Sequence, residues 1–495
     1  MLRYCGFLIL LCCGLSGWSR ADDQPDVLFI AVDDLNDWVQ CLGGRAGVHT
    51  PNLDRLAAQG TLFTNAHCAA PSCNPSRVAV MTGVAPHQSG IYHNGQSWRA
   101  APRLRNAVTL PEHFRSQGYR AVGGGKIFHA LSWIQDAYGK QQNEARLWDA
   151  YFPSADRPLP PTLWPKEAQA KTNARGYTQW KPIARTRDPQ IPRPAHFWDW
   201  APMDEAESGM ADHQVVSWAI DAWRGRKGQP VFQAVGIFRP HIPWFVPKKY
   251  FDLYPLEQVK LPTIRENDHD DTSPVGQGFC RRQWHTWAAE NDMWRGAVQA
   301  YLASISFADA QLGRLLDAVE DDARQRRQTG RQRKTIIVLW SDHGMHIGEK
   351  THWEKFTLWE ESTRVPLMVV APGVTTPGNV CSKPVSLLDI YPTLNQLCGL
   401  PQRDDLSGES LVPLLKDPTA KRRTPALTSW GRNNFAVRTE RFRYIQYHNG
   451  DRELYDHKRD PHEFTNLAAG DAESWEQQLK ELAQWIPRET AERVP

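Results

Sequence analysis

The sequence predicts an α/β fold: a large, doubly wound, mostly parallel sheet, followed by a smaller C-terminal α+β domain with an antiparallel sheet. Short apolar runs that suit buried strands alternate with amphipathic helical patterns along most of the chain. After residue 418 the pattern changes to short aromatic and β-branched runs separated by turn residues. The length of 495 residues, 41% of them hydrophobic, is ample for a large core.

Composition excludes several classes of protein. A disordered chain or a small disulfide scaffold would not combine this length with this apolar content. The 58 Lys and Arg residues nearly balance the 55 Asp and Glu residues, which leaves a net charge of +3 with no long run of one sign. The charge balance therefore gives no reason to expect a nucleic-acid partner. A local basic pocket is still compatible with this small net charge.

Residues 1–21 are predicted to be a signal peptide. Arg3 supplies a positive start, residues 6–15 form an apolar stretch too short to span a bilayer, and residues 19–21 fit a cleavage site. We expect an exported protein, periplasmic or secreted, with no stable membrane span after signal removal; a retained anchor is the alternative. Among the six cysteines of the mature chain, Cys381 and Cys398 could form a disulfide.

The strands and helices follow from local patterns. Residues 26–33 form an apolar run closed by carboxylates, as expected of a strand buried on both faces. Thr50 and Pro51 then fit the N-cap and first position of a helix that ends at Gly60. Further helix and strand pairs are predicted at 110–117 with 119–122, 212–226 with 231–238, and about 295–324 with 335–340.

The C-terminal part, residues 419–495, is predicted to form a separate subdomain after a larger α/β domain over residues 22–418. Its strands are expected at 435–439, 442–448 and 453–457, followed by a helix with Trp475, Leu479, Leu482 and Ile486 on one face. Between Tyr138 and Met210 the chain is rich in Pro and Trp and has little periodicity. This segment is either a substrate-facing insertion or an ordinary packed excursion.

Polar residues at two strand ends suggest a metal site. Asp33 and Asp34 end the first strand, and Asp342 and His343 follow the strand at 335–340. Open parallel sheets bind ligands beyond the carboxyl ends of their strands, and hard divalent cations prefer several oxygen ligands. Solvated turns or helix caps are the alternative for these carboxylates.

Two further strand ends carry cations and imidazoles. Lys126 and His129 follow the strand at 119–122, and Arg239 and His241 follow the strand at 231–238. Each pair directly follows a buried strand, at the sheet edge where an anionic substrate would bind. Together with the acidic strand ends they outline a pocket with a metal, cations and general acid–base groups.

The segment Cys73-Asn-Pro-Ser-Arg77, followed by residues 78–83, resembles the signature of the type I sulfatases, in which the Cys is oxidised to formylglycine. The resemblance extends over nearly the whole mature chain. It includes Asp33-Asp34 and the segments 341–344, 348–349, 387–393, 453–456 and 460–463.

Within that superfamily the sequence is most similar to the iduronate-2-sulfatases. Residues 125–129, 239–243 and 301–307 carry this likeness, as does His343 after Asp342. Lys355 lies thirteen residues beyond Asp342, as in the same pattern. The segment 84–86 and the insertion rich in Pro and Trp depart from it, which leaves the sugar specificity open.

The resemblance implies an alkaline-phosphatase-like core and one Ca²⁺ per chain. The implied metal ligands are Asp33, Asp34, Asp342, His343 and the modified Cys73. A formylglycine-generating enzyme would convert Cys73 during maturation. The hydrated aldehyde offers two hydroxyls on one carbon: one attacks sulfur, and the other, once deprotonated, expels sulfate.

The resemblance also implies roles for the neighbouring residues. Arg77 would stabilise the aldehyde hydrate, and Lys126 and Lys355 would bind sulfate oxygens. His129 is the candidate base for sulfate release, and His241 is the candidate acid for the leaving oxygen.

The expected function is hydrolysis of sulfate esters on a sulfated mono-, oligo- or polysaccharide, with an iduronate 2-sulfate-like substrate as the leading case. The alternatives are a phosphonate or phosphate monoester hydrolase of the same superfamily and a catalytically inactive, secreted glycan-binding protein.

Overall fold

A computed structural model describes residues 24–45, 47–129, 144–153, 169–172, 178–180, 198–330, 333–470 and 472–495. The predicted signal peptide and much of the segment between Tyr138 and Met210 lie outside these residues. In the described part of the chain, no helix has the length and apolar character needed to cross a membrane.

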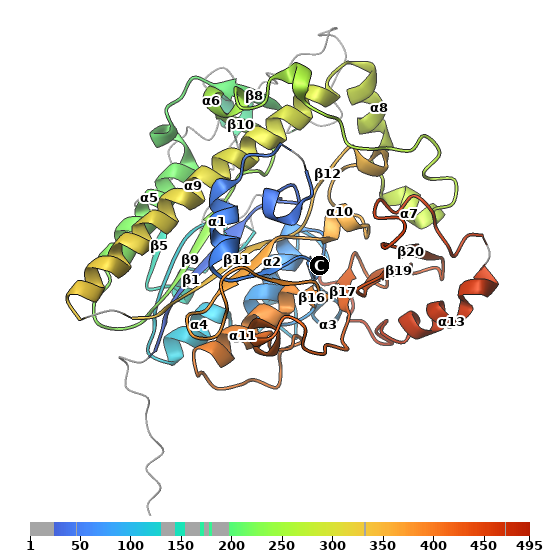
Figure 1. Ribbon diagram of the computed structural model, residues 1–495. Coiled ribbons are helices and arrows are strands. Elements are labelled where there is room, and N and C mark those ends of the chain that lie inside the picture. Colours follow the sequence, from blue (N-terminus) through green and yellow to red (C-terminus); the bar gives the residue numbers. More distant parts are fainter. Residues whose placement is uncertain are drawn as a thin grey trace, which may run out of the picture.

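A mixed, mostly parallel sheet forms the centre of the molecule (Figure 1). Its eight strands, among the described residues, are in spatial order β15 (Asn379–Cys381), β2 (Thr61–Phe63), β14 (Leu367–Val370), β11 (Thr335–Ser341), β1 (Asp26–Val32), β9 (Val231–Ile237), β4 (Arg120–Gly125) and β5 (Ala150–Phe152). Only β14 runs antiparallel to its neighbours. The predicted fold class is therefore confirmed.

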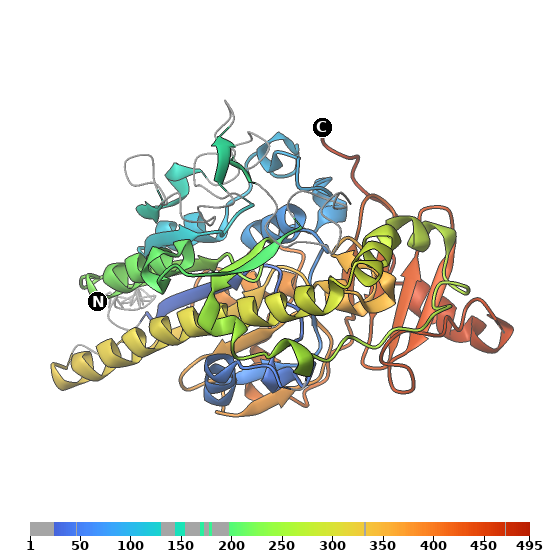
Figure 2. The ribbon, with the colours of Figure 1, turned by 90° about the horizontal axis from the view of Figure 1, so that it is seen from above.

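Helices cover both faces of this sheet, as the buried runs predicted. Alternate residues of β1 point to opposite faces, so Leu28 and Ile30 belong to one hydrophobic cluster and Val27 and Phe29 to the other. The first cluster contains α1 (Pro51–Gln59), α5 (Ala211–Arg224) and α9 (Trp294–Gln328). The second contains α2 (Cys73–Thr82), α4 (Leu110–Ser116) and α11 (Ile390–Leu397). Figure 2 shows α9 running along the molecule.

Shorter elements connect this frame. They are β3 (Ala66–His67), α3 (Pro86–Ser89), β6 (Gln169–Thr172), β7 (Thr178–Trp180), β8 (Trp200–Met203), β10 (Trp244–Pro247), α6 (Lys248–Phe251), α7 (Pro274–Phe279), α8 (Arg282–Glu290), β12 (His346–Ile347), β13 (Trp353–Glu354), α10 (Glu360–Thr363), β16 (Val385–Ser386) and α12 (Val412–Lys416). The predicted helices and strands shift by only a few residues, because their caps and apolar runs define them locally.

The described parts of the segment between Tyr138 and Met210 contain more regular structure than the sequence suggests. Within it, β5 pairs in parallel with β4 and extends the main sheet. Trp198 and Trp200 are buried and pack against each other, 5.7 Å between ring centroids. Strands of three or four residues are too short to show a period, which explains the difference.

The cysteine pairing considered from sequence is not formed. Cys381 and Cys398 are both buried, and neither they nor the other described cysteines form a disulfide. The Cys381 thiol donates to the Pro418 carbonyl at 3.5 Å, whereas the Cys398 thiol interacts with Tyr119. The two side chains are therefore held by different partners.

The C-terminal residues form a four-stranded antiparallel sheet at one side of the main sheet (Figure 1). Its strands are β17 (Ala426–Ser429), β18 (Phe435–Arg438), β19 (Phe442–Gln446) and β20 (Arg452–Asp456), and α13 (Ala472–Ala483) follows them. The Ser429 amide donates to the Ala69 carbonyl at 2.9 Å, close to Cys73 in the chain. The exact boundary at residue 419 stays a prediction.

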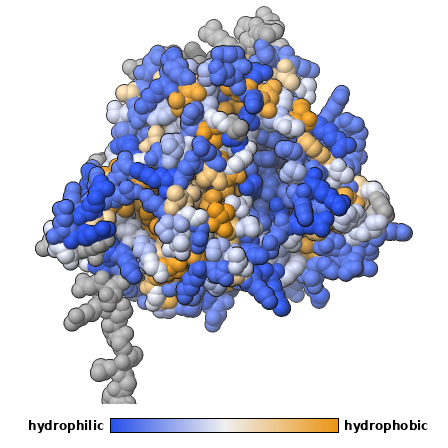
Figure 3. All heavy atoms as spheres, in the orientation of Figure 1, coloured by the Kyte–Doolittle hydropathy of each residue, from blue (hydrophilic) through white to orange (hydrophobic). Residues whose placement is uncertain are grey.

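The surface is largely hydrophilic. On the face seen in Figure 3, hydrophobic side chains form scattered patches among hydrophilic ones, and the most continuous of these patches lies near the middle. The large hydrophobic side chains with substantial exposure among the described residues are Leu253, Leu256, Ile264, Val380 and Trp485.

A buried ionic network joins the C-terminal sheet to α10. Glu360 forms ion pairs with Arg438 at 3.1 Å and with Arg443. Glu463 accepts from His457 at 2.8 Å and pairs with Arg443 at 2.6 Å. Burial alone would raise the pKa of Glu360, but Arg438, His457 and Arg443 hold this pKa well below its usual range.

We expect Glu360→Gln to lower the thermal midpoint at pH 7, with a loss in unfolding free energy on the order of 3 kcal/mol. The lowered pKa of Glu360 means that its stabilising charge is fully present above the pKa of an unfolded Glu, about 4.3, and is lost as pH falls through the folded pKa. The midpoint difference between the two proteins should therefore shrink in acid. Glu440→Gln, at a surface pair with Lys383, is the matched control and should change little. A difference that stays constant down to pH 3 would contradict this assignment.

Candidate active site

The sheet brings the predicted site residues to one edge. Val32 is in register with both Ser341 and Ile237, and Gly125 with Gly236, so these strands end side by side. The predicted residues that follow these strand ends are Asp33, Asp34, Lys126, His129, His241, Asp342 and His343. Cys73 and Arg77 lie in α2, and Lys355 directly follows β13. The structure brings all ten residues into one connected cluster, and their roles stay predictions.

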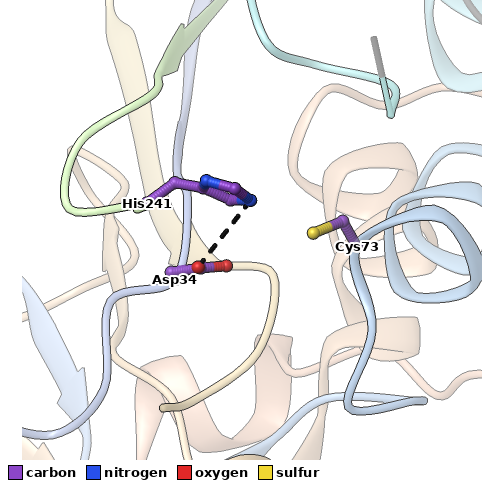
Figure 4. A group of neighbouring side chains, drawn as sticks. All are labelled: Asp34, Cys73 and His241. Atoms are coloured by element: carbon purple, nitrogen blue, oxygen red, sulfur yellow. Dashed lines mark ion pairs between the residues drawn. The ribbon is translucent and has the colours of Figure 1, made fainter. Parts of the chain in front are cut away.

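Cys73 is the first residue of α2 and is fully buried. Its sulfur lies 3.2 Å from Nε2 of His343 and 3.7 Å from Nζ of Lys126. In Figure 4 the thiol points toward the space between Asp34 and His241. The preceding turn is fixed by Asn94, whose side-chain oxygen accepts from the Ser72 hydroxyl at 2.7 Å.

Arg77, one turn along α2, links the two acidic strand ends. Its Nε donates to Asp342 at 2.8 Å and a terminal nitrogen donates to Asp33 at 2.9 Å. The other terminal nitrogen donates to the carbonyls of Lys126 and Ile127. Arg77 is therefore engaged with the carboxylates and the backbone, and direct contact with a substrate stays a prediction.

Two lysines neutralise the remaining carboxylate charge. Nζ of Lys126 forms an ion pair with Asp33. Nζ of Lys355 lies 2.7 and 2.8 Å from the two carboxylate oxygens of Asp34. Both lysines are nearly inaccessible to solvent, so the pairing is made in a medium of low polarity.

The acidic residues fit a hard divalent cation. Asp33, Asp34 and Asp342 each offer an oxygen, and these oxygens lie within 4.8 Å of one another. Nδ1 of His343 donates to the Gly344 carbonyl at 2.9 Å, which directs Nε2 toward the carboxylates, and Nε2 can act as a ligand once a bound cation displaces its proton. That Nε2 atom lies 3.4 Å from Asp34 and 3.6 Å from Asp342. Several oxygens and one oriented imidazole nitrogen are a suitable donor set for such a cation.

The electrostatics favour a charged Cys73. Burial alone would raise the pKa of the Cys73 thiol, but Lys126, Lys355 and His343 hold it well below its ordinary value. Burial raises the pKa of Asp342 to about 7, even though Arg77 and His343 oppose this rise. The cluster thus concentrates positive charge around the Cys73 side chain.

Two histidines flank this centre. Nδ1 of His241 lies 2.5 Å from the Ile242 carbonyl, and its Nε2 lies 3.9 Å from Asp34 (Figure 4). The His241 side chain is 22% exposed, whereas Asp34 has no exposure, so His241 lies on the solvent side. His129 interacts with the Cys73 thiol, and burial is the main cause of its lowered pKa.

Sequence reasoning missed two supporting contacts. The Ser76 hydroxyl donates to the Asp342 carbonyl at 2.5 Å, and its place inside the Cys73–Arg77 motif was the available signal. The Tyr301 hydroxyl donates to the Asp34 carbonyl at 2.8 Å. Tyr301 lies near the start of α9, in the segment 301–307 that carries the family resemblance, and that resemblance was the available signal, although it does not name Asp34 as the partner.

Comparison with known proteins identifies the family. The family described as "Sulfatase" matches residues 25–400, and "N-sulphoglucosamine sulphohydrolase, C-terminal" matches residues 348–489. A protein named "Sulfatase" from Formosa agariphila is 37% identical over 487 residues, which cover 93% of this chain and 88% of the relative. Human iduronate 2-sulfatase is 30% identical over 434 residues, which cover 79% of this chain and 72% of the relative.

A solved structure in complex with its substrate D-glucosamine-2-N,6-O-disulfate shares the fold, with a TM-score of 0.70 and 19% identity. The match covers 94% of this chain and 97% of that one. The family match spans the main sheet and every predicted site residue. The chain therefore belongs to the sulfatase family and is a sulfuric ester hydrolase.

Proposed function

We propose that this sulfatase hydrolyses sulfate esters of a sulfated glycan with Cys73 as formylglycine and one Ca²⁺. The observation that carries the proposal is the position of Cys73. It lies beside a set of three carboxylates and one oriented imidazole, with Arg77, Lys126 and Lys355 in the same cluster. The filled set of site residues argues against an inactive binding protein. The relatives at 30–37% identity are sulfatases, which favours sulfate esters over phosphonate or phosphate esters, whereas the solved phosphonate monoester hydrolases, at 20–21% identity, share the fold alone.

Asp33, Asp34, Asp342 and His343 would hold the Ca²⁺ together with the modified Cys73. The bound cation would lower the pKa of a coordinated hydroxyl and offset negative charge on the substrate. Arg77 holds Asp33 and Asp342 in a fixed orientation, so the carboxylates need little reorganisation when a cation binds.

An aldehyde at Cys73 would supply, as its hydrate, one hydroxyl to attack sulfur and a second whose deprotonation drives sulfate release. His129, which interacts with the Cys73 side chain, would accept the proton of the second hydroxyl. Lys126 and Lys355 would stabilise negative charge on the sulfate oxygens.

His241 would protonate the leaving oxygen. Its Nδ1 faces the Ile242 carbonyl, so the transferable proton belongs on Nε2, the atom directed toward Asp34 and the centre. The 22% exposure of the side chain suits a residue at the point where the alcohol product departs.

The leading substrate is a glycan carrying an iduronate 2-sulfate-like group. Human iduronate 2-sulfatase is among the relatives that match over most of their length, and His343 belongs to the pattern of that subfamily. We also propose that residues 1–21 direct export to the periplasm or the outside, and that a formylglycine-generating enzyme modifies Cys73 during maturation.

A desulfation screen tests the substrate. Protein co-expressed with a formylglycine-generating enzyme should release sulfate from defined 2-O-sulfated uronate oligosaccharides faster than from their 6-O- or N-sulfated counterparts. Chromatography of the products measures both rate and position. Turnover of an aryl sulfate without release from any sulfated glycan would refute the glycan assignment but preserve the sulfatase chemistry.

Replacing Cys73 tests the nucleophile. Cys73→Ser keeps a hydroxyl but provides no second oxygen on the same carbon, so we expect multiple turnover of an aryl sulfate to be abolished while the thermal midpoint is retained. Cys68→Ser is the matched control, because Cys68 is equally buried and its thiol donates to the Ser362 carbonyl. Sustained turnover by Cys73→Ser at the wild-type rate would refute the mechanism.

Replacing Asp34 tests the metal site. Asp34 has a φ of 59°, which Asn also tolerates, so Asp34→Asn removes charge without backbone strain. We expect Ca²⁺ to raise the thermal midpoint of chelator-treated wild type, and Asp34→Asn to weaken this response and reduce sulfate release by more than about 100-fold. Asp37→Asn, at a pair with Arg364 outside the cluster, should keep the Ca²⁺ response. A normal Ca²⁺ response and normal activity in Asp34→Asn would remove Asp34 from the site.

A further inference from the structure

The loop that carries Lys355 has an unusual backbone. Among the described residues, eight that are not glycine have positive φ, and four of them lie in this loop. They are Lys350 at 50°, Thr351 at 49°, Glu354 at 71° and Phe356 at 79°. Such conformations cost roughly 1–3 kcal/mol each and persist only where the surroundings hold them in place.

His352 connects this loop to the junction of α7 and α8. Its Nε2 donates to the Lys355 carbonyl at 2.9 Å, and its Nδ1 accepts from the Arg281 amide at 2.9 Å. The side chain is fully buried, and burial lowers the pKa of His352 to about 3. The imidazole is therefore neutral, with its proton on Nε2, and both ring nitrogens are engaged.

The Arg281 side chain contacts the residues on either side of Lys355. Its guanidinium forms an ion pair with Glu354, and its Cζ atom lies 5.1 Å from the ring centroid of Phe356. The same guanidinium lies 4.5 Å from the ring of Trp284 in α8. A single side chain thus ties both neighbours of Lys355 to α8.

The position of this loop sets the geometry at the centre. Lys355 contacts both carboxylate oxygens of Asp34, and the Phe356 amide donates to the Pro71 carbonyl at 3.2 Å, two residues before Cys73. A shift of the loop would therefore move the Lys355 ammonium relative to Asp34 and Cys73. Misplacement of a catalytic group by about 1 Å can cost roughly 100-fold in rate.

We propose that Arg281 and His352 are positioning residues that hold the Lys355 ammonium in its catalytic place. Neither residue belongs to the cluster around Cys73, and each acts through the Lys355 loop. This inference rests on the proposed function, because it takes Lys355 as a group that stabilises the reacting sulfate.

A double-mutant cycle tests the inference. His352→Leu, Lys355→Ala and the double variant are compared by kcat and KM on an aryl sulfate, with thermal midpoints recorded for each. We expect His352→Leu to lower kcat about 10- to 100-fold in the wild-type background and to have no further effect once Lys355 is Ala. His352→Gln, which keeps a donor for the Lys355 carbonyl, should recover part of the loss.

A second cycle combines Arg281→Met with Lys355→Ala, because Arg281 is partly exposed and its replacement is less disruptive to folding. Arg281→Met keeps the apolar stem on Trp284 and Phe356 but removes the pair with Glu354. This variant decides the inference if His352→Leu does not fold. His113→Leu, which deletes a buried imidazole from α4, is the control and should lower the midpoint without changing kcat.

Two outcomes would overturn the inference, and they are distinguishable. Equal losses from His352→Leu or Arg281→Met in both backgrounds would show that the two residues act independently of Lys355, with the proposed function intact. Wild-type kcat and KM in Lys355→Ala alone would remove Lys355 from the chemistry, and with it that part of the proposed function.

Discussion

The buried carboxylates at the ends of β1 and β11 are the constraint on which the rest of the site depends. Asp33, Asp34 and Asp342 have no solvent exposure, and they place oxygens within 4.8 Å of one another. Like charges this close repel strongly where water is excluded, so the fold must supply cations. Arg77, Lys126 and Lys355 meet this need. These three cations are also suited to binding an anionic ester. The charges that stabilise the buried carboxylates in the folded protein are therefore the ones that the proposed chemistry uses.

The three cations differ in how the structure holds them. Arg77 lies in a buried helix and Lys126 follows a strand of the main sheet, whereas Lys355 depends on a loop with left-handed residues. Lys350 anchors that loop, because its ammonium lies 2.6 Å from the Glu463 carbonyl of the C-terminal subdomain. The ionic network around Glu360 joins the same subdomain to α10 shortly after Lys355. The C-terminal sheet is thus part of the support of the active centre.

The sequence was informative wherever a residue's role follows from its neighbours in the chain. Asp33 and Asp342 end apolar runs, so parallel pairing alone brings them together, and the Cys73 to Arg77 spacing places both on one helix. It was uninformative about support from distant segments. Nothing near Arg281 indicates its pair with Glu354, and the segment 301–307, although it carries the family resemblance, does not indicate that Tyr301 binds Asp34. Such contacts depend on how α8 and α9 pack, which local patterns do not encode.

The state of Cys73 in active protein is the most direct test of the proposed chemistry. The measurement is the mass of the peptide containing Cys73, from protein whose sulfate release has been assayed in the same preparation. The account predicts that CH₂SH is replaced by CHO, partly as its hydrate, and that the modified fraction scales with activity across preparations. Full activity in a preparation whose Cys73 is entirely an unmodified thiol would contradict it.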